Sequence, residues 1–201
     1  MDRVQVGVID MLHRAGASMR SPIACTIRPV ALSFLLALSV SAHAEQVPEA
    51  VIDSCLLFDR SSDSSISISP IEGDANLIDE VTTPGYQLFT PEGDRNKLRV
   101  GYATSKRGSD DYIFVGPRRG FIKRAVAVGK LPPTRVEEPS LAAFAVLRQR
   151  GQRYVCVMES NGNGSTAFVR SAFVGRIPLS KNATLKLFYK VADVKKLRGT
   201  Q

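Results

Sequence analysis

Residues 153–160, Arg-Tyr-Val-Cys-Val-Met-Glu-Ser, decide the fold of this chain. In an extended strand Tyr154, Cys156 and Met158 point to one side, and the two valines between them point to the other. Apolar residues on both sides are typical of a central strand that is covered on both faces. The stretch therefore predicts a β-sheet between two layers, with Cys156 facing one of them.

The stretch continues into two further strands, which predicts a meander. Residues 161–164, Asn-Gly-Asn-Gly, favour a turn because Asn-Gly pairs tolerate the positive φ that tight hairpins require. Residues 166–174 predict the second strand and residues 183–191 the third. The third is apolar at alternate positions, with Lys186 and Lys190 on its other face. We expect one dry face and one mostly solvent-exposed face in this strand.

A short helix is expected upstream, over residues 48–58. Apolar residues recur there at one-turn spacing, and Pro48 suits the first position of a helix. Cys55 lies on the apolar side and can face the sheet that carries Cys156. In an oxidising compartment this even pair of cysteines predicts one disulfide, and two separate buried thiols are the alternative. Closing a loop of about 100 residues contributes about 4–5 kcal/mol in the chain-entropy model.

The middle of the chain contains further strand candidates and several ambiguous segments. Short strands are expected at residues 86–89, 97–104 and 111–115, divided by turn clusters. The remaining expectations are a loop or short edge strand over residues 60–69, a short acidic helix over residues 71–81, a turn at residues 117–120, and a strand or helix over residues 121–128.

Residues 141–150 permit two interpretations. Ser140 could cap a helix and the alanines favour one. However, residues 141–147 are apolar all round without a helical stripe, and residues 148–153 could form a hairpin turn. We favour the strand.

Residues 1–44 carry the pattern of a secretory signal peptide. An apolar run over residues 30–40 is too short to span a bilayer comfortably, and small residues at Ala42 and Ala44 match a cleavage site. A buried helix or a membrane anchor is the alternative. Translation from Met19 would give a signal peptide of more ordinary length. We therefore expect a periplasmic or secreted protein without a transmembrane span after processing.

These patterns together define the expected fold class. Residues 45–201 should form a single β-rich exported domain. The fold should be α+β and predominantly antiparallel β, with a meander or sandwich-like sheet and an N-terminal helix after the cleaved signal peptide.

Charge is divided along the chain. Residues 45–94 hold 11 acidic residues and one basic residue, a net charge of −10, whereas residues 95–201 hold 22 basic and 6 acidic residues, a net charge of +16. Such asymmetry predicts either pairing between the two segments or oppositely charged faces.

The surplus of positive charge predicts a face for an anionic partner. The candidate anion-binding residues are Arg118, Arg119, Lys123, Arg124, Arg148, Arg150 and Arg153, with Lys195, Lys196 and Arg198 near the C-terminus. For an exported protein the candidate partners are lipopolysaccharide, a phospholipid surface, an acidic glycan or an acidic protein. Nucleic acid is the weaker option, because it is scarce where a secreted protein works and strand alternation explains most of the interleaved aromatic residues.

The sequence of residues 45–201 carries no recognisable catalytic motif. It contains no histidine, which excludes serine–histidine and cysteine–histidine pairs, and no nucleotide-binding, zinc-protease or calcium-loop motif. We therefore expect no cofactor and no metal site. Carboxylates that could serve a glycan-acting enzyme are Asp59, Asp63, Asp74, Asp79 and Glu80, although carboxylates in an acidic segment usually form a solvated surface.

The sequence thus favours a non-enzymatic binding or interaction protein of the cell envelope, with a basic C-terminal face. An alternative within this class is a periplasmic inhibitor or immunity-type protein that blocks its partner through a loop such as residues 161–165. The second class is a carboxylate-based, glycan-acting enzyme.

Overall fold

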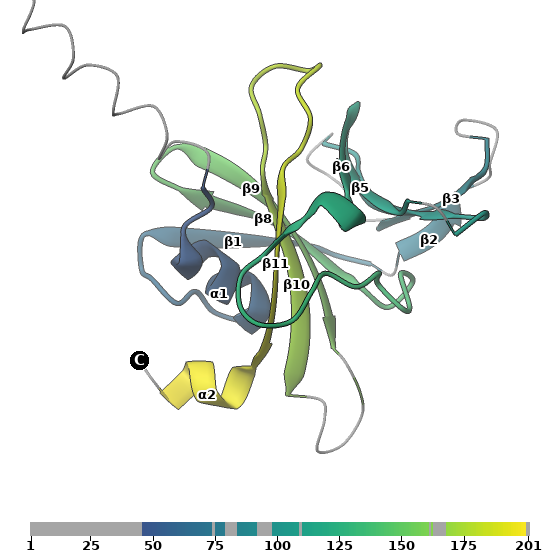
Figure 1. Ribbon diagram of the computed structural model, residues 1–201. Helices are drawn as coiled ribbons and strands as arrows, with labels where there is room; N and C mark the ends of the chain where they lie inside the picture. The colour runs from purple at the N-terminus through teal and green to yellow at the C-terminus, as the bar shows by residue number, and fades with distance from the viewer. Residues whose placement is uncertain are drawn as a thin grey trace, which may run out of the picture. The chain divides into compact units, whose positions relative to one another are not determined.

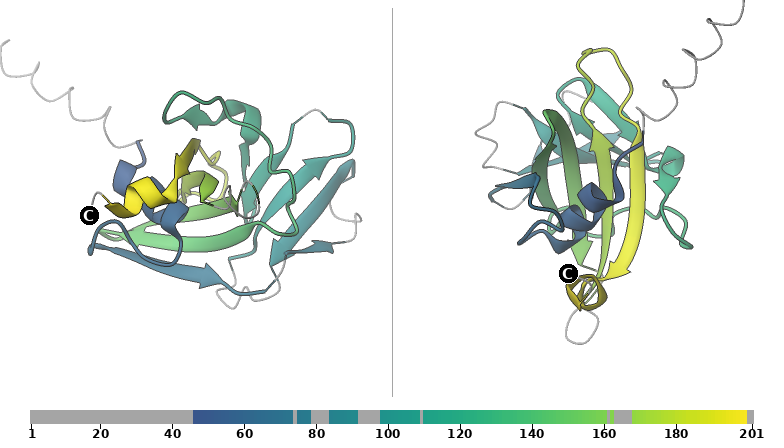
Figure 2. Two further views of the ribbon diagram at one scale, coloured as in Figure 1. Left: turned by 90° about the horizontal axis from the view of Figure 1, so that it is seen from below. Right: turned by 90° about the vertical axis from the view of Figure 1, so that its left-hand side faces the viewer.

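The computed structural model describes residues 46–73, 75–78, 84–91, 98–108, 110–160, 162 and 168–199. These residues build two β-sheets and two α-helices (Figure 1), so the predicted β-rich α+β fold is confirmed. Helix α1 (Glu49–Leu57) covers one face of the larger sheet, and the smaller sheet packs against the other face. Figure 2 shows helix α2 (Val194–Gly199) beside α1, away from the smaller sheet.

The larger sheet has six strands in the order β1-β8-β9-β10-β11-β7. Their bounds are β1 Ile66–Ile71, β7 Val126–Ala127, β8 Ala143–Gln149, β9 Gln152–Ser160, β10 Val169–Arg176 and β11 Leu187–Asp193. Neighbouring strands are antiparallel except β11 and β7, which are parallel. The predicted meander is present as β9, β10 and β11.

The smaller sheet has five antiparallel strands in sequence order. Their bounds are β2 Ala75–Ile78, β3 Tyr86–Pro91, β4 Val100–Ser105, β5 Tyr112–Val115 and β6 Arg118–Phe121. A short 3-10 helix, η2 (Ile122–Arg124), follows β6 and leads to β7. The chain therefore passes from one sheet to the other within a few residues after Phe121.

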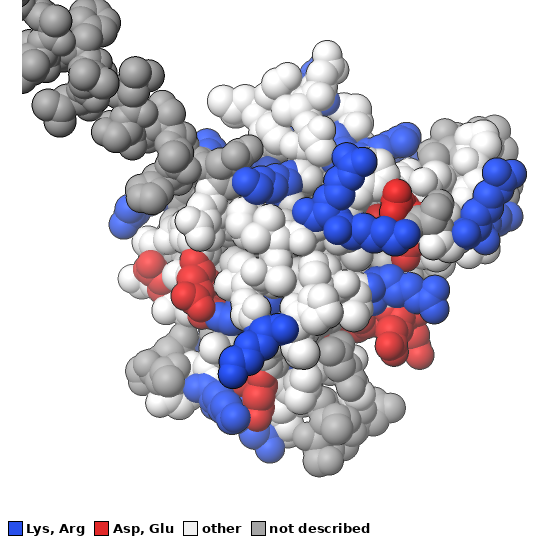
Figure 3. Space-filling model, viewed as in Figure 1, with Lys and Arg blue, Asp and Glu red and all other residues white. Residues whose placement is uncertain are grey.

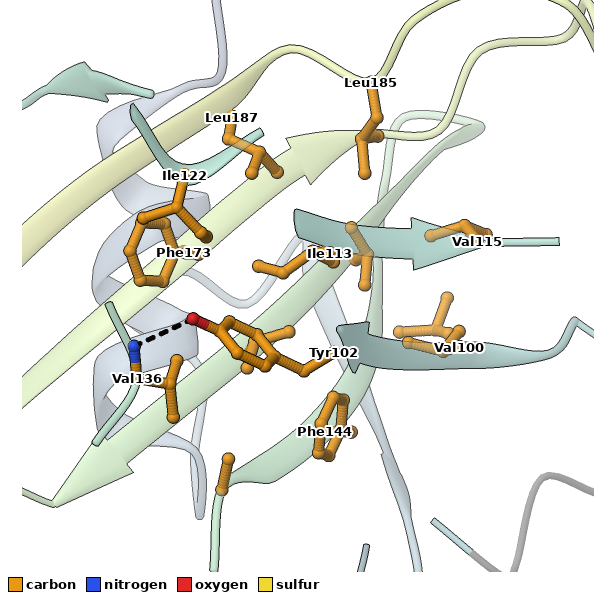
Figure 4. Close-up of a cluster of buried hydrophobic side chains, with 14 of the residues drawn as sticks. Val100, Tyr102, Ile113, Val115, Ile122, Val136, Phe144, Phe173, Leu185 and Leu187 are labelled. Atoms are coloured by element: carbon orange, nitrogen blue, oxygen red, sulfur yellow. Dashed lines mark hydrogen bonds between the residues drawn. The ribbon is translucent and has the colours of Figure 1, made fainter. Parts of the chain in front are cut away.

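Alternate residues of both sheets fill the space between them (Figure 4). This agrees with the period of two that places every second side chain of a strand on the same face. The buried residues include Val100, Tyr102, Ile113 and Val115 from the smaller sheet and Phe144, Val155, Val157 and Phe173 from the larger sheet. The core on this face of β9 is thus apolar and buried, as the valines of residues 153–160 predict.

A long connection between β7 and β8, residues 128–142, closes one side of this core; we call it the strap. The backbone N–H of Val136 donates to the Tyr102 hydroxyl at 3.1 Å (Figure 4), and Thr134 Oγ1 and the Tyr189 hydroxyl lie 2.9 Å apart. Glu159 Oε1 accepts hydrogen bonds from the N–H groups of residues 137 and 138, at 2.9 and 3.0 Å. The bonds of Val136 and Thr134 satisfy polar groups at the edge of the core, whereas the N–H groups bonded to Glu159 are exposed.

Helix α1 forms a second core with the opposite face of the larger sheet. Cys55 on the helix and Cys156 on β9 are fully buried there and form the predicted disulfide, with their Cα atoms 5.7 Å apart. The two positions are 101 residues apart in the sequence. The disulfide therefore closes a long loop and joins the acidic segment to the basic one.

The face of residues 183–191 that we predicted to be mostly solvent-exposed is exposed at Thr184 and Lys186, but α1 covers it within β11, where the prediction is wrong. Phe188 is buried in the core beneath the helix. Lys190 is only 15% exposed in its side chain, and its Nζ contacts Glu49 Oε1 at 2.8 Å and Asp53 Oδ1 at 2.7 Å. A lysine reaches a covered face when its charge is paired there and its stem packs against apolar surface.

Several ambiguous segments are now assigned. Residues 141–150 contain β8, so the favoured strand is correct, and the edge strand expected within residues 60–69 is β1. The acidic helix expected over residues 71–81 is wrong where the segment is described, because β1 ends at Ile71 and β2 spans Ala75–Ile78. Residues 121–128 are neither a single strand nor a single helix, since they contain η2 and β7.

The predicted turn at residues 117–120 is also wrong, because these residues largely form β6. The turn lies one residue earlier, at Gly116 and Pro117, with Gly116 at φ 57°. Val115 and Arg118 are paired across this turn. Gly120 lies against the chain where it enters β11: a Cβ atom would come within 2.6 Å of the Leu185 carbonyl oxygen and 2.7 Å of Leu187 Cγ. Its glycine therefore serves close packing between the sheets rather than a turn.

Within the described ranges, no helix is long and apolar enough to cross a membrane. The predicted signal peptide, residues 1–44, lies outside those ranges.

Candidate anion-binding site

Three segments that are distant in the sequence meet at one end of the larger sheet. Arg150 and Gly151 join β8 to β9, and residues 177–186 join β10 to β11. Every second connection of an antiparallel meander lies at the same end, and the Ile177 N–H donates to the Arg153 carbonyl at 2.8 Å. From the smaller sheet, Arg118 donates to the carbonyls of Leu179 (3.2 Å) and Ser180 (3.0 Å). Figure 1 shows the loop of residues 177–186 projecting at the top of the view.

This end of the molecule is rich in cations, and we call it the basic end. Its members are Arg118, Arg148, Arg150, Arg153, Arg176, Lys181 and Lys186. Figure 3 shows several Lys and Arg side chains over the upper part of one face, while most acidic side chains there lie lower. Among the described residues, no carboxylate forms an ion pair with Arg118, Arg148, Arg150, Arg153 or Lys181.

The β8–β9 hairpin presents three arginines within six residues. Arg150 and Gly151 occupy the turn with φ of 48° and 76°, the left-handed conformation that tight two-residue hairpin turns require. Arg148 and Arg153 are direct partners across the two strands and so share one face. The charge of Arg150 also reaches Asp63, whose pKa lies below its ordinary value chiefly because the Ser65 N–H donates to its carboxylate, at 2.7 Å.

A groove of about 350 Å³ lies beside the projecting loop. It is lined by Gln152, Arg176, Ile177, Pro178, Leu179, Ala183, Thr184 and Lys186. The Arg176 guanidinium donates to Gln152 Oε1 at 2.9 Å, which joins β10 to the start of β9. The groove thus combines an apolar wall from the loop with a rim of cationic and amide groups.

Arg119, Lys123 and Arg124 do not join the basic end, although we grouped them with Arg118. Alternate residues of β6 face opposite sides, so Arg119 lies on the outer face of the smaller sheet, with its guanidinium 4.9 Å from the Tyr112 ring centre. Lys123 pairs with Asp110 at 3.3 Å, and the Arg124 guanidinium lies 5.3 Å from the Phe121 ring centre. These cations cover aromatic side chains or pair with a carboxylate.

A smaller pocket of about 160 Å³ lies on that outer face. Arg99 and Arg119 rim it, and Tyr112 and Phe114 contribute to its lining. Tyr112 and Phe114 are nearly fully buried, and Tyr112 makes edge contacts with neighbouring rings, the nearest being Tyr86 at 4.9 Å. The arrangement is a small aromatic core on the outer face of the sheet, covered in part by Arg119.

The C-terminal cations are also separate from the basic end. Arg198 on α2 pairs with Asp59 at 2.9 Å, and Lys195 lies 3.7 Å from the centre of the Phe168 ring. The Arg170 guanidinium donates to the carbonyls of Leu56 and Leu57, at 2.8 and 2.9 Å, and so caps the C-terminus of α1. The acidic N-terminal segment thus pairs with part of the basic segment, as one of our two interpretations expects.

The polar network around Tyr102 holds the fold together. The Tyr102 hydroxyl donates to Asp111 Oδ2 at 2.9 Å and accepts from the Val136 N–H, while Asp111 Oδ1 accepts from the Ser105 N–H at 2.8 Å. Burial, together with the negative charge of Asp111, raises the pKa of Tyr102 far above its ordinary value. Tyr102 therefore stays neutral and joins the strap to the end of the β4–β5 hairpin.

The carboxylates proposed for a glycan-acting enzyme do not form a described acid–base pair. Asp59 pairs with Arg198, and Asp63 accepts from the Ser65 N–H. Asp74, Asp79 and Glu80 lie outside the described residues. The loop of residues 161–165, which the inhibitor alternative would use, also lies outside them apart from Gly162. Within the part of the chain that the structure describes, no group of three or more His, Cys, Asp or Glu side chains is placed to hold a metal ion.

Sequence reasoning missed the contribution of the loop at residues 177–186. Arg176, Lys181 and Lys186 are separated in sequence from the arginines of the β8–β9 hairpin, so no charge run marks them. The signal was in the predicted meander, because its alternate connections must lie at the same end of the sheet. The contact of Arg118 with the loop had no such signal, since it depends on how the two sheets pack.

Comparisons of the sequence with protein-family models and with curated proteins, and of the fold with solved structures, found no match. The fold and site by themselves define a β-rich α+β protein with two packed sheets, a disulfide that joins α1 to the larger sheet, and a basic end.

Proposed function

We propose that this protein is an exported, non-enzymatic binding protein whose basic end recognises an anionic component of the cell envelope. The observation that carries the proposal is that three separate segments bring five arginine and lysine residues to one end of the larger sheet, where none of them forms an ion pair with a described carboxylate. They are Arg118, Arg148, Arg150, Arg153 and Lys181.

Folding alone gives little reason for this convergence. Like charges directly opposite each other on neighbouring strands are unfavourable, and Arg148 and Arg153 occupy such a position. Clustered cations of one sign instead raise the local concentration of anions and accelerate their association. Arg150 interacts with the charge of Asp63 only at a distance, and an anionic partner would supply direct opposite charge to all five side chains.

Cations elsewhere in the protein support the same reading by contrast. Lys190, Arg198 and Lys123 each contact a carboxylate at 3.3 Å or less. Arg170 donates to two helix carbonyls instead. Among the described residues, these cations thus have carboxylate or carbonyl partners within the fold, whereas Arg148, Arg150, Arg153 and Lys181 form no ion pair with a described carboxylate.

The candidate partners remain lipopolysaccharide, a phospholipid surface, an acidic glycan or an acidic protein. An inhibitor that acts through residues 161–165 would use the connection between β9 and β10 and would not need the basic end. The two modes therefore make different predictions for charge-reversal variants.

Retention of the purified protein on immobilised lipopolysaccharide and on polygalacturonate, across a salt series, tests the proposal. Reversing Arg148 and Arg150 to Glu should weaken retention about tenfold near physiological ionic strength, where exposed charges interact strongly only within a Debye length of about 8 Å. The matched control reverses Arg107 and Lys130, which lie in the β4–β5 turn and in the strap and give the same change in net charge. Equal losses in both variants would contradict a localised site.

A further inference from the structure

We propose that the loop of residues 177–186 docks the protein on an anionic lipid bilayer, with Leu179 entering the interface between headgroups and acyl chains. The cations of the basic end would then contact the lipid phosphates. This inference rests on the proposed function and names its partner as a bilayer rather than a soluble anion.

Leu179 is the first observation. Its side chain is 96% exposed, compared with 71% for Leu141 and 56% for Leu131. It follows Pro178, which limits the backbone freedom of the loop. An exposed apolar side chain in a loop with basic residues near it combines the two contributions to binding at a membrane interface, buried apolar area and attraction to anionic lipids.

The second observation is the contact that holds the loop. Arg118 donates from Nε to the Ser180 carbonyl and from Nη2 to the Leu179 carbonyl. A loop that enters a membrane interface needs its backbone carbonyls satisfied, because apolar surroundings cannot hydrogen-bond to them. Arg118 satisfies two of them and at the same time places a positive charge beside Leu179.

The third observation is the charge around the loop. Lys181 follows Leu179 by two residues, and the β8–β9 hairpin brings Arg148, Arg150 and Arg153 to the same end. Basic residues close to a membrane surface are attracted to anionic lipids, and the attraction falls off within a Debye length. Pro178, which is half-buried and lines the adjacent groove, extends the apolar surface beside Leu179.

Vesicle binding of the full purified protein tests this proposal. The probes are vesicles of phosphatidylcholine alone and of phosphatidylcholine with increasing phosphatidylglycerol. The wild type should bind only the anionic vesicles. Leu179→Ser should lower the vesicle partition coefficient about tenfold and leave retention on polygalacturonate unchanged, because the glycan offers no apolar phase. Leu141→Ser, which alters another exposed leucine, should change neither measurement.

Tryptophan fluorescence gives an independent measurement, since the chain contains no tryptophan. Leu179→Trp should show a blue-shifted emission on anionic vesicles, and Leu141→Trp should not. This pair reports the environment of the loop directly and does not depend on the strength of binding.

The outcomes separate this inference from the proposed function. The proposed docking role of the loop would be overturned by any of three results. These are vesicle binding by Leu179→Ser as strong as that of the wild type, an equal loss of binding in Leu141→Ser, or no blue shift in Leu179→Trp. If the protein is retained on polygalacturonate but does not bind anionic vesicles, the bilayer-docking proposal fails and the proposed function stands. If neither probe is bound at low salt, both fail.

Discussion

The helix-covered face of the larger sheet and the basic end both contain several cations, but the cations of the two regions differ in their partners. Under α1, Lys190 contacts two carboxylates, and Arg170 donates to two carbonyls. At the basic end, Arg148 and Arg153 face each other across two strands, and neither forms an ion pair with a carboxylate in the described part of the chain. The charge asymmetry of the sequence is therefore resolved partly by internal pairing and partly as an exposed surface.

This comparison predicts that changes under α1 affect stability and that changes at the basic end affect binding. Four predictions test this division, beginning with the largest effect on the free energy of unfolding.

Replacing Cys55 and Cys156 together by Ala should have the largest effect. Their disulfide closes a loop of 101 residues, so the free energy of unfolding should fall by about 4–5 kcal/mol. Urea unfolding followed by circular dichroism measures this change, with reduced wild-type protein as the control. A loss below about 1 kcal/mol would mean that the packing of α1, rather than the cross-link, holds the helix on the sheet.

Replacing Lys190 by Met should lower the free energy of unfolding by about 1–2 kcal/mol near neutral pH, because Asp53 loses its ion pair while remaining largely covered. Glu49→Gln, at the exposed end of the same cluster, is the control and should cost less than about 0.5 kcal/mol. A loss in Glu49→Gln as large as in Lys190→Met would show that burial does not distinguish the two contacts.

The same cluster predicts a dependence on pH. The hydrogen bond and charge of Lys190 lower the pKa of Glu49 from 4.5, so its contribution is present above that pH and is lost as the pH falls further. Burial opposes the charge of Lys190, but hydrogen bonds and charges from Asp53 and Glu49 outweigh it and raise its pKa above 10.5. The contribution of Lys190 is therefore present below pH 10.5 and is lost as the pH rises through its folded pKa. Lys190→Met should flatten both limbs of the stability profile.

Replacing Arg148 by Gln should have the smallest effect on stability. The free energy of unfolding should change by less than about 0.5 kcal/mol or rise slightly, because the substitution removes a like-charge pair with Arg153. Thermal unfolding measures this, and salt-dependent retention on polygalacturonate should fall in the same variant. A loss of stability above about 1 kcal/mol would show that Arg148 serves the fold instead.

The sequence could predict the elements whose patterns are local. The alternation in residues 153–160 identified β9 as covered on both faces, and the pair Cys55 and Cys156 identified the contact with α1. The pattern predicted a turn in place of β6, because Pro117 and Gly120 are typical of turns. Gly120 is instead needed for the close approach of Leu185. The pattern also took Lys190 as a solvent-facing residue, because nothing local shows that α1 covers that face.

The candidate site was predictable only in part, for the same reason. The arginines of the β8–β9 hairpin stand close together in the sequence, so composition alone marks them. Arg118 belongs to the basic end because the packing of the smaller sheet brings its side chain to the Ser180 carbonyl. Arg119 does not, because its side chain lies on the opposite face of β6. Adjacent arginines in a strand thus have separate surroundings, which a charge count cannot show.

The most direct test follows the arginine side chains themselves. Nuclear magnetic resonance of the guanidinium Nε–H groups would be recorded while a soluble acidic glycan is added. If the basic end is the binding surface, the signals of Arg148, Arg150 and Arg153 should shift and saturate together, whereas those of Arg170 and Arg198 should stay in place, because their Nε atoms are buried and their Nη groups already contact the acidic segment. Shifts centred on Arg198, or no shift at the hairpin at low salt, would contradict the basic end as the binding surface.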